Sequence, residues 1–267
     1  MKTYDLSNFY QKLKEKFNKS NGRDTLIYLL EEFSNTINLE DERAIIFVGN
    51  ELSSFLRVKG VIDLSYKIYS VIEKLVIKNY GSYSEEYATL LINIGDLDIV
   101  AKNNEKAIEN LTKAEKIAMT KENNDYLLAS IYNNRSAAFR NLKLFDQAEN
   151  DINKAMMLTS NAEKIAVSQI NLAEIKLAQN DCVKAINLID KAISYYEKNN
   201  LYIPHLANAY ATAASIYYKL NEYDKSISYL EKAIDIFDHN IGNGPIRDML
   251  LKNLAKVKQK RDSLCKE

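Results

Sequence analysis

The chain has 267 residues and a formal net charge of zero, because 36 Lys and Arg balance 36 Asp and Glu. This length fits one large domain or two small ones, and the balanced charge argues against a general nucleic-acid binder, which usually carries a basic excess. Hydrophobic residues make up 46%, which excludes a disordered chain, and seven Gly with two Pro disfavour a turn-rich β architecture.

Export signals, membrane spans and metal-site motifs are not indicated by the sequence. The N-terminal residues are too charged for a secretory signal peptide, and no window approaches eighteen consecutive apolar residues. Cys182 and Cys265 form neither a ligand cluster nor a disulfide framework, and reduced thiols fit a cytosolic chain. We therefore expect a cytoplasmic protein with no membrane contact, no metal and no cofactor.

Two amphipathic helices are predicted at the N-terminus. Residues 4–18 and 24–38 place apolar side chains at helical spacing, and Asn21-Gly22 interrupts the pattern between them. We interpret residues 1–39 as an N-terminal helical cap. Glu40-Asp41-Glu42 then indicates the start of the next helix, whose positive end favours acidic side chains.

A repeat of two helices follows this cap. In the copy that spans residues 91–114, Gly95 is followed by Ala107 twelve positions later, and then by Leu111 and Ala114 on the same helical face. The equivalent small residues of the first helices are Ser53, Gly95, Ser136, Ala173, Ala214 and Ala255. Successive steps are 42, 41, 37, 41 and 41 residues. A regular period in this range indicates a repeat solenoid, since one copy cannot bury its own apolar face.

Five helix pairs are predicted over residues 40–243, followed by a capping helix in residues 244–267, all in one continuous domain. The pairs are 41–58 with 61–78, 84–101 with 104–120, 125–141 with 145–159, 163–179 with 182–198, and 203–220 with 223–239. Turn residues separate the helices of four pairs at Gly60, Asn103-Asn104, Asn180-Asp181 and Asn221. The third pair has no helix breaker at Lys143-Leu144, so only the register places that turn.

The two prolines give a further signal for the register. Pro204 and Pro245 each lie ten residues before a small residue of the repeat, and proline is tolerated in the first turn of a helix. The final helix, over 245–264, has a basic outer face that suits a solvated cap. Its members are Lys252, Lys256, Lys258, Lys260 and Arg261.

The repeat resembles the tetratricopeptide repeat family, whose pattern places an aromatic, a small residue and another aromatic in the first helix, then Ala and an aromatic in the second. In the third copy these places hold Tyr132, Ser136, Phe139, Ala148 and Ile152. Several positions depart from the pattern. Asp98 in the second copy and Lys176 in the fourth stand at the second aromatic place, and Arg135 in the third copy replaces the leucine that precedes the small residue in the family pattern. The joint register of five copies carries the resemblance.

The resemblance implies an all-α fold, a right-handed α-α superhelix with a concave inner surface. The long repeat is similar to that of kinesin light chains and of some bacterial peptide-sensing proteins. In this fold the residue two positions before each small residue faces the concave side. That position holds Glu51, Asn93, Asn134, Asn171, Thr212 and Asn253.

Four asparagines in six places indicate a binding ladder. One amide offers an acceptor and two donors, so it can hold both the C=O and the N–H of an extended peptide. The resemblance implies the same use of asparagines in relatives. The alternative is that these amides are solvated or bond to the neighbouring helix.

Further side chains are projected onto the same surface, among them Asn50, Asn133, Arg140 and Asn208. We count these four as candidate peptide-binding residues, in a groove of mixed charge. Arg140 could hold a partner carboxylate through its fork geometry. The alternative reading for Arg140 is an intramolecular ion pair.

Catalytic signals are poor. His205 and His239 lie at opposite ends of one helix pair, and no acid, base or nucleophile recurs at a spacing that would converge in space. We therefore expect a non-enzymatic adaptor or scaffold that binds an extended peptide or the tail of another protein. The alternative function is a regulatory receptor for a small signalling peptide that switches conformation. We expect a monomer or weak homodimer, because the charged final helix disfavours end-to-end stacking.

Overall fold

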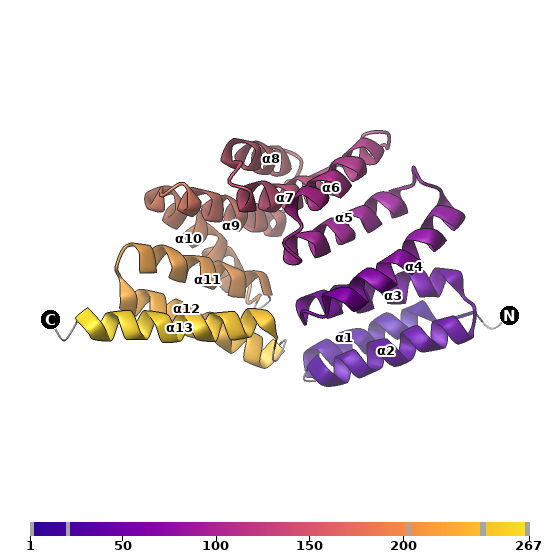
Figure 1. Ribbon diagram of the computed structural model, residues 1–267, viewed down its shortest axis with the longest axis horizontal. Helices are drawn as coiled ribbons and strands as arrows, with labels where there is room; N and C mark the ends of the chain where they lie inside the picture. The colour runs from indigo at the N-terminus through magenta and orange to yellow at the C-terminus, as the bar shows by residue number, and fades with distance from the viewer. Residues whose placement is uncertain (1–2, 20–21, 202–203, 241–243, 265–267) are drawn as a thin grey trace. The chain divides into compact units, whose positions relative to one another are not determined.

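The computed structural model describes residues 3–19, 22–201, 204–240 and 244–264, and this part of the chain contains helices and no strand (Figure 1). The helices are α1 (Leu6–Lys19), α2 (Gly22–Asn38), α3 (Glu42–Val58), α4 (Ile62–Tyr80), α5 (Glu85–Val100), α6 (Asn104–Ala118), α7 (Asp125–Asn141), α8 (Phe145–Met157), α9 (Ala162–Ala178), α10 (Cys182–Lys198), α11 (Pro204–Lys219), α12 (Tyr223–Asn240) and α13 (Pro245–Leu264). The all-α repeat architecture is therefore confirmed, and each predicted helix lies within a few residues of its observed bounds.

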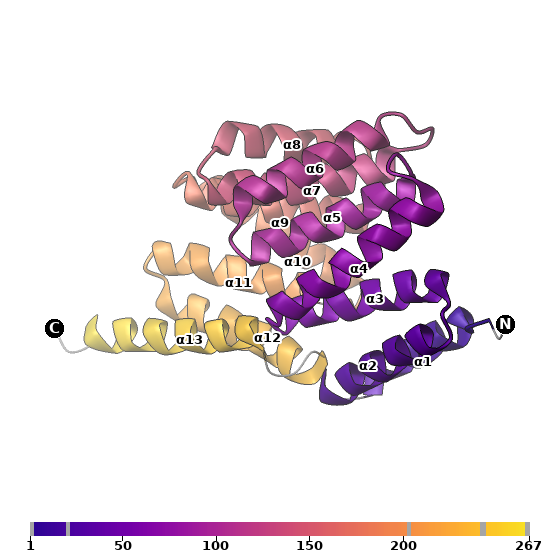
Figure 2. The same cartoon turned by 45° about the vertical axis from the view of Figure 1, so that its right-hand side comes forward.

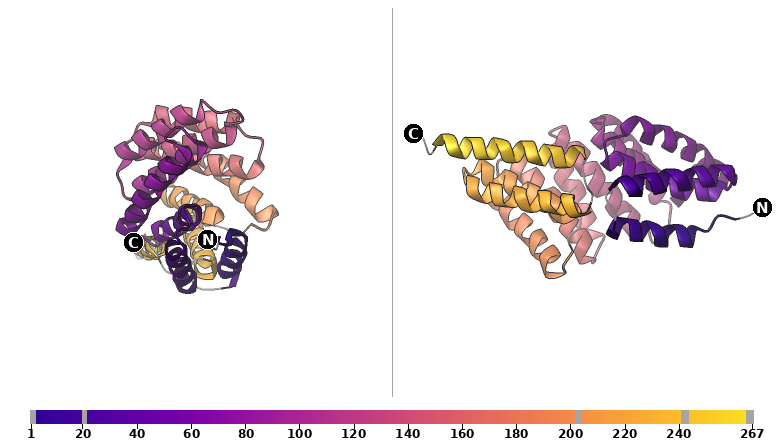
Figure 3. Two further views of the ribbon diagram at one scale, coloured as in Figure 1. Left: turned by 90° about the vertical axis from the view of Figure 1, so that its right-hand side faces the viewer. Right: turned by 90° about the horizontal axis from the view of Figure 1, so that it is seen from below.

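The chain divides into two compact units, residues 1–134 and 135–267, and the division falls inside α7. The first unit contains α1 to α6, and Figure 2 shows α5 and α6 there as neighbouring antiparallel helices. The second unit contains α8 to α13, where α13 lies along α12 (Figure 3). The repeat pattern predicts one continuous domain, and that statement stays a prediction.

Small residues bring the two helices of each pair close together. The first-helix positions Ser53, Ser136, Ala173 and Ala214 are buried, as are their second-helix counterparts twelve residues later. The approach is close at Gly95, because a Cβ atom there would lie 2.8 Å from Cγ of the buried Leu111. The interior is thus packed to a fixed spacing, in which an added methyl group forces neighbours to move.

Where the second small residue is serine, a buried hydrogen bond joins the helix pair. Ser65 Oγ donates to the carbonyl of Ser53 at 2.7 Å, and Ser226 Oγ donates to the carbonyl of Ala214 at 2.8 Å. The two bonds occupy the same register in the first and fifth copies. By contrast, the hydroxyl of Ser53 is buried and has no hydrogen-bond partner among the described residues.

The turn inside each pair has one geometry in all five copies. The seventh residue after the first small residue adopts a left-handed conformation, with φ between 61° and 76°. These residues are Gly60, Lys102, Lys143, Asn180 and Asn221. The next N–H bonds back to a carbonyl five residues earlier, for example Leu144 N to Phe139 O at 2.9 Å, as in a Schellman helix end.

The turns lie where the sequence predicts, although the special residue differs in the second pair. Lys102 takes the left-handed conformation there, while Asn104 is already the first residue of α6. The turn at Lys143-Leu144, predicted from register alone, is confirmed. Helices α11 and α13 begin at Pro204 and Pro245, as expected for prolines in a first turn.

The N-terminal helices are packed onto the first pair. Phe9 is buried and stacks on Tyr28, with ring centroids 5.9 Å apart. The carboxylate of Asp41 accepts from the N–H of Tyr4 and of Ala44, each at 3.0 Å, which caps α3 and fixes the start of the chain. These bonds to the ionised form lower the pKa of Asp41.

The charged residues that depart from the repeat pattern are buried with partners. Asp98 is fully buried and accepts from Tyr66 Oη at 2.6 Å and from Asn110 Nδ2 at 2.8 Å. Lys176 donates to Glu149 at 2.6 Å. Arg135 forms two bonds to Asp151, Nε to Oδ2 at 2.7 Å and Nη2 to Oδ1 at 3.1 Å. Each departure is therefore compensated inside the core, as buried charge requires.

Candidate functional site

A groove of about 880 Å³ lies in the second unit. It is formed by the ends of α7 and α8, by α9 and α11, which are the first helices of two successive pairs, and by α13. The lining residues are Arg140, Asn141, Lys143, Phe145, Glu174, Leu177, Ala178, Asn208, Ala211, Thr212, Ser215, Tyr218, Lys219, Met249, Leu250 and Asn253. The groove thus lies on the side of the first helices, where the register predicts the binding surface.

Four predicted site residues line this groove: Arg140, Asn208, Thr212 and Asn253. Asn208 and Asn253 are exposed, so their amides are accessible to a partner. Thr212 is only 5% exposed, and its Oγ1 donates to Glu174 at 3.1 Å. Asn171 is half-buried and already has an interaction partner. The second unit therefore presents two free amides and one hydroxyl committed to a neighbouring helix.

Arg140 forms an ion pair with Glu174, which joins the end of α7 to α9. Both side chains are about one-quarter exposed, and partial burial lowers the pKa of Arg140. The alternative for Arg140, an intramolecular ion pair, is thus observed. The same register recurs in the first unit, where Arg57 Nη1 lies 2.6 Å from Asp96 Oδ2. In both cases the arginine of one copy pairs with the acid of the next copy.

Three predicted residues of the first unit, Asn50, Glu51 and Asn93, already bond to other side chains. Asn93 Nδ2 donates to Asn50 Oδ1 at 3.3 Å, which links the first helices of two successive copies. Glu51 accepts a hydrogen bond from the Tyr10 hydroxyl, and burial raises the pKa of Glu51. Burial together with the Glu51 charge raises the pKa of Tyr10 to about 12. The alternative of asparagine bonding to a neighbouring helix is thus observed at Asn93.

Two further candidates lie near the division between the units. Asn133 is 9% exposed, and its Nδ2 donates to the carbonyl of Ala129 on its own helix at 3.0 Å. Asn134 is half-buried and is the last residue of the first unit. The two sets of candidates therefore belong to separate units, and a continuous ladder through both stays a prediction.

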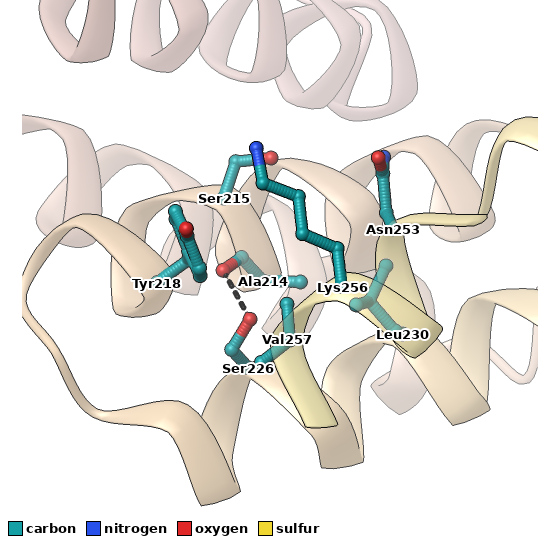
Figure 4. Close-up of a pocket in the computed structure, with 8 residues that line it drawn as sticks. All are labelled: Ala214, Ser215, Tyr218, Ser226, Leu230, Asn253, Lys256 and Val257. Atoms are coloured by element: carbon teal, nitrogen blue, oxygen red, sulfur yellow. Dashed lines mark hydrogen bonds between the residues drawn. The ribbon is translucent and has the colours of Figure 1, made fainter. Parts of the chain in front are cut away.

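Beside the groove is a smaller pocket of about 140 Å³ between α11, α12 and α13. Its floor is formed by the buried Ala214, Leu230 and Val257. Figure 4 shows the polar ends of Ser215, Lys256 and Asn253 on one side of this pocket. Because Ser215, Tyr218 and Asn253 line both cavities, the pocket opens beside the groove.

Comparison with known proteins supports the repeat register. Residues 207–240 match the tetratricopeptide repeat family. This segment is a tetratricopeptide repeat, and the chain has a tetratricopeptide-like helical repeat fold. The matched segment contains most of α11 and all of α12, the pair that borders both cavities. No curated protein matches the sequence.

Solved structures share the tetratricopeptide fold at low sequence identity. BtubC (BKLC) from P. vanneervenii is 15% identical with a TM-score of 0.59, and the match covers 82% of this chain and 92% of that one. Aspartyl phosphate phosphatase F from Bacillus subtilis is 20% identical with a TM-score of 0.56, over 86% and 61% of the two chains. RapI in its apo form is 18% identical with a TM-score of 0.54, over 97% and 71%. These likenesses show the fold.

Some residues that line the groove or the adjoining pocket were not among the predicted site residues, although the register contains a signal for them. Lys143 is the left-handed turn residue of the third copy and lines the groove. Lys256 follows its small residue by one, the position that holds Asp96 and Glu174 in other copies. Lys258 and Arg261, expected on a solvated face, are partly exposed and also reach Glu231 and Asp224 of α12 at 2.9 and 3.2 Å.

The two histidines, which were considered as catalytic residues, make contacts of a structural kind. His205 stacks on Tyr196 with centroids 6.5 Å apart, and His239 Nδ1 lies 2.8 Å from the carbonyl of Asp235. Cys182 is a half-buried free thiol, and Cys265 lies outside the described residues. In the described ranges, no three His, Cys, Asp or Glu are grouped to hold a metal ion. Helices there also lack the length and apolar character needed to cross a membrane.

Proposed function

We propose that the chain is a protein-interaction module that binds an extended peptide segment of a partner in the groove of the second unit. The observation that carries this proposal is the groove itself, which collects exposed polar groups from α11 and α13. Its volume of about 880 Å³ is within the range of about 300–1,000 Å³ that is typical of ligand sites. The tetratricopeptide fold supports a function in protein interaction.

Exposed amides suit the backbone of an extended segment. Asn208 and Asn253 each offer two donors and one acceptor, which can pair with peptide groups whatever the peptide side chains are. Each neutral hydrogen bond adds about 0.5–1.5 kcal/mol net. Apolar lining at Phe145, Tyr218 and Met249 supplies contact area for partner side chains. Amides and apolar contacts together support micromolar binding of a short segment.

The test begins with selection of a library of random twelve-residue peptides, displayed on phage, against the immobilised full chain. A recovered peptide is then synthesised with a fluorophore, and its affinity is measured by fluorescence anisotropy. The Asn208→Ala/Asn253→Ala variant should bind about 5- to 150-fold more weakly, from two lost bonds of about 0.5–1.5 kcal/mol each.

A matched control removes two exposed asparagines outside the groove. Asn150 on α8 and Asn187 on α10 are both exposed, and neither lines the groove. The Asn150→Ala/Asn187→Ala variant should bind as wild type does, with equal helicity by circular dichroism. Equal loss in both variants, or no loss in the groove variant, would contradict the proposal.

The other asparagines of the ladder, Asn93 and Asn134 in the first unit and Asn171 in the second, extend the proposal. In the triple variant Asn93→Ala, Asn134→Ala and Asn171→Ala, we expect weaker binding than in wild type if the partner segment continues along the ladder. Unchanged affinity of a correctly folded triple variant would restrict the binding site to the groove lined by Asn208 and Asn253.

A second candidate function is regulatory, and the division of the chain into two compact units inside one helix favours it. A small peptide that prefers one conformation of the chain would shift the population toward it. Small-angle scattering with and without a recovered peptide tests this function. Unchanged dimensions at saturating peptide would exclude the switch and leave the adaptor function.

A further inference from the structure

The groove of the second unit has a charge bias that the whole chain lacks. Its lining contains three cationic side chains, Arg140, Lys143 and Lys219, and one carboxylate, Glu174. Over the full chain the two signs are equal at 36 each. Glu174 is already neutralised, since it pairs with Arg140 and accepts from Thr212. The remaining charge on the lining is therefore positive.

The adjoining pocket adds a fourth cation. Lys256 lies at its rim, with Nζ 5.6 Å from the centre of the Tyr218 ring, a cation–π contact that holds the ammonium beside the groove (Figure 4). Lys219 on α11 is held by a hydrogen bond, because its Nζ donates to the carbonyl of Leu177 on α9 at 3.2 Å. Both ammonium groups are thus positioned by the protein, and neither is paired with a carboxylate in the described ion pairs.

The pocket itself selects an apolar side chain. Ala214, Leu230 and Val257 on its floor are almost fully buried, and the volume is about 140 Å³. An apolar cavity of about 150 Å³ in another protein holds a benzene molecule, so this pocket has the size for one branched aliphatic or aromatic side chain. The polar groups lie at the rim, so that residues flanking such a side chain meet Lys256, Ser215 and Asn253 (Figure 4).

We propose that the second unit binds an acidic peptide segment, with one apolar side chain in the α11–α13 pocket and flanking carboxylates on Lys219 and Lys256. This inference rests on the proposed function and specifies the chemistry of the partner. A concave surface with one sign of charge and low-dielectric walls raises the local concentration of the opposite charge. The apolar pocket favours a peptide over a nucleic acid, whose polyanionic backbone offers no aliphatic anchor.

The same peptide selection provides the test. Recovered peptides should be enriched in Asp and Glu next to a Leu, Ile, Met or Phe. Replacing their Asp and Glu by Asn and Gln should weaken binding, and affinity should fall as salt is raised from 50 to 500 mM. The Lys219→Gln/Lys256→Gln variant should bind about 2- to 30-fold more weakly, as expected for two exposed ion pairs.

Two matched variants isolate the charge and the pocket. Lys191 and Lys198 on α10 are exposed and lie outside both cavities, so Lys191→Gln/Lys198→Gln removes the same charge and should leave the affinity unchanged. Ser215 is an exposed rim residue, so Ser215→Trp should fold normally and cover the pocket. We expect Ser215→Trp to abolish the preference for an apolar anchor.

Each outcome is decisive. The acidic-segment inference would be overturned if the recovered peptides had no acidic excess, or if Lys219→Gln/Lys256→Gln left the affinity unchanged. In that case the Asn208→Ala/Asn253→Ala variant would still test the proposed function. Equal binding of a twelve-nucleotide oligothymidine would overturn it in favour of a general anion surface. Failure to recover any peptide above background would refute both the inference and the proposed function.

Discussion

The buried pair Arg135–Asp151 gives the sharpest test of how this core accommodates charge. Arg135 is 7% exposed and Asp151 is 2% exposed, and two hydrogen bonds join them. The fourth copy of the repeat has Leu172 and Leu188 at the same two places, where Leu172 belongs to an apolar cluster and Leu188 packs against that cluster. The chain therefore contains an apolar version of the same packing site, which defines the control substitution.

Removing one partner leaves the other buried without compensation. We expect Asp151→Leu or Arg135→Leu to destabilise the second unit by about 3–5 kcal/mol. At roughly 4 °C per kcal/mol for a unit of this size, the melting temperature should fall by about 12–20 °C. The double variant Arg135→Leu/Asp151→Leu should be neutral or more stable than wild type by about 1–4 kcal/mol, because it removes both desolvation costs.

The measurement is a double-mutant cycle by urea unfolding, followed by circular dichroism at 222 nm. Two single costs of about 3–5 kcal/mol and a neutral or stabilised double variant together require a coupling energy of at least about 6 kcal/mol between the two sites. Single variants that each cost less than about 1 kcal/mol, with an additive double variant, would refute it. Loss of the contact between Arg135 and the Phe139 ring, 5.9 Å from the guanidinium carbon, affects both Arg135 variants equally.

Three further predictions concern single positions. Lys102→Asn should stabilise the first unit by about 0.5–1 kcal/mol in urea unfolding, because Asn tolerates the left-handed turn better than Lys; a lower midpoint would contradict this. Ser65→Ala should cost about 0.5–1.5 kcal/mol through its lost bond, whereas Ser53→Ala should cost nothing, since its buried hydroxyl has no partner; equal costs would argue against the observed geometry. Burial, followed by the bond to Asp98, raises the pKa of Tyr66 to about 12, so its stabilising contribution is complete below pH 10 and is lost as pH rises toward 12. Tyr66→Phe should therefore flatten the decline in melting temperature between pH 10 and 12, and an unchanged slope would exclude Tyr66 as a cause.

The fold was largely accessible from the sequence because the repeat register fixes several features together. Small residues twelve positions apart predict the close helix pair, and even the turn without a breaker at Lys143 lies at the predicted place. The division inside α7 was not accessible. The repeat continues through residues 134 and 135 with no change in composition, and compactness depends on contacts between distant residues.

The candidate site was accessible only in part. The register indicates which helix face is concave, and three of the residues it singled out, Asn208, Thr212 and Asn253, line the groove. It does not indicate whether a side chain is free, because Asn133 bonds to its own helix and Asn93 to Asn50. A side chain is available to a partner only if it has no hydrogen bond within the chain. Those bonds depend on three-dimensional distances, which the spacing of the repeat does not give.

The ion pair between Arg140 and Glu174 has a consequence for how binding would be detected. Because this pair joins α7 to α9 and also lines the groove, a ligand carboxylate that bonds to Arg140 competes directly with Glu174. The cost of breaking the Arg140–Glu174 contact is then part of the ligand's observed affinity, and that affinity sets how far the ligand stabilises the native state by mass action. A ligand that reaches Arg140 therefore gains less affinity from that contact, and raises the melting temperature correspondingly less, than it would if Arg140 were unpaired.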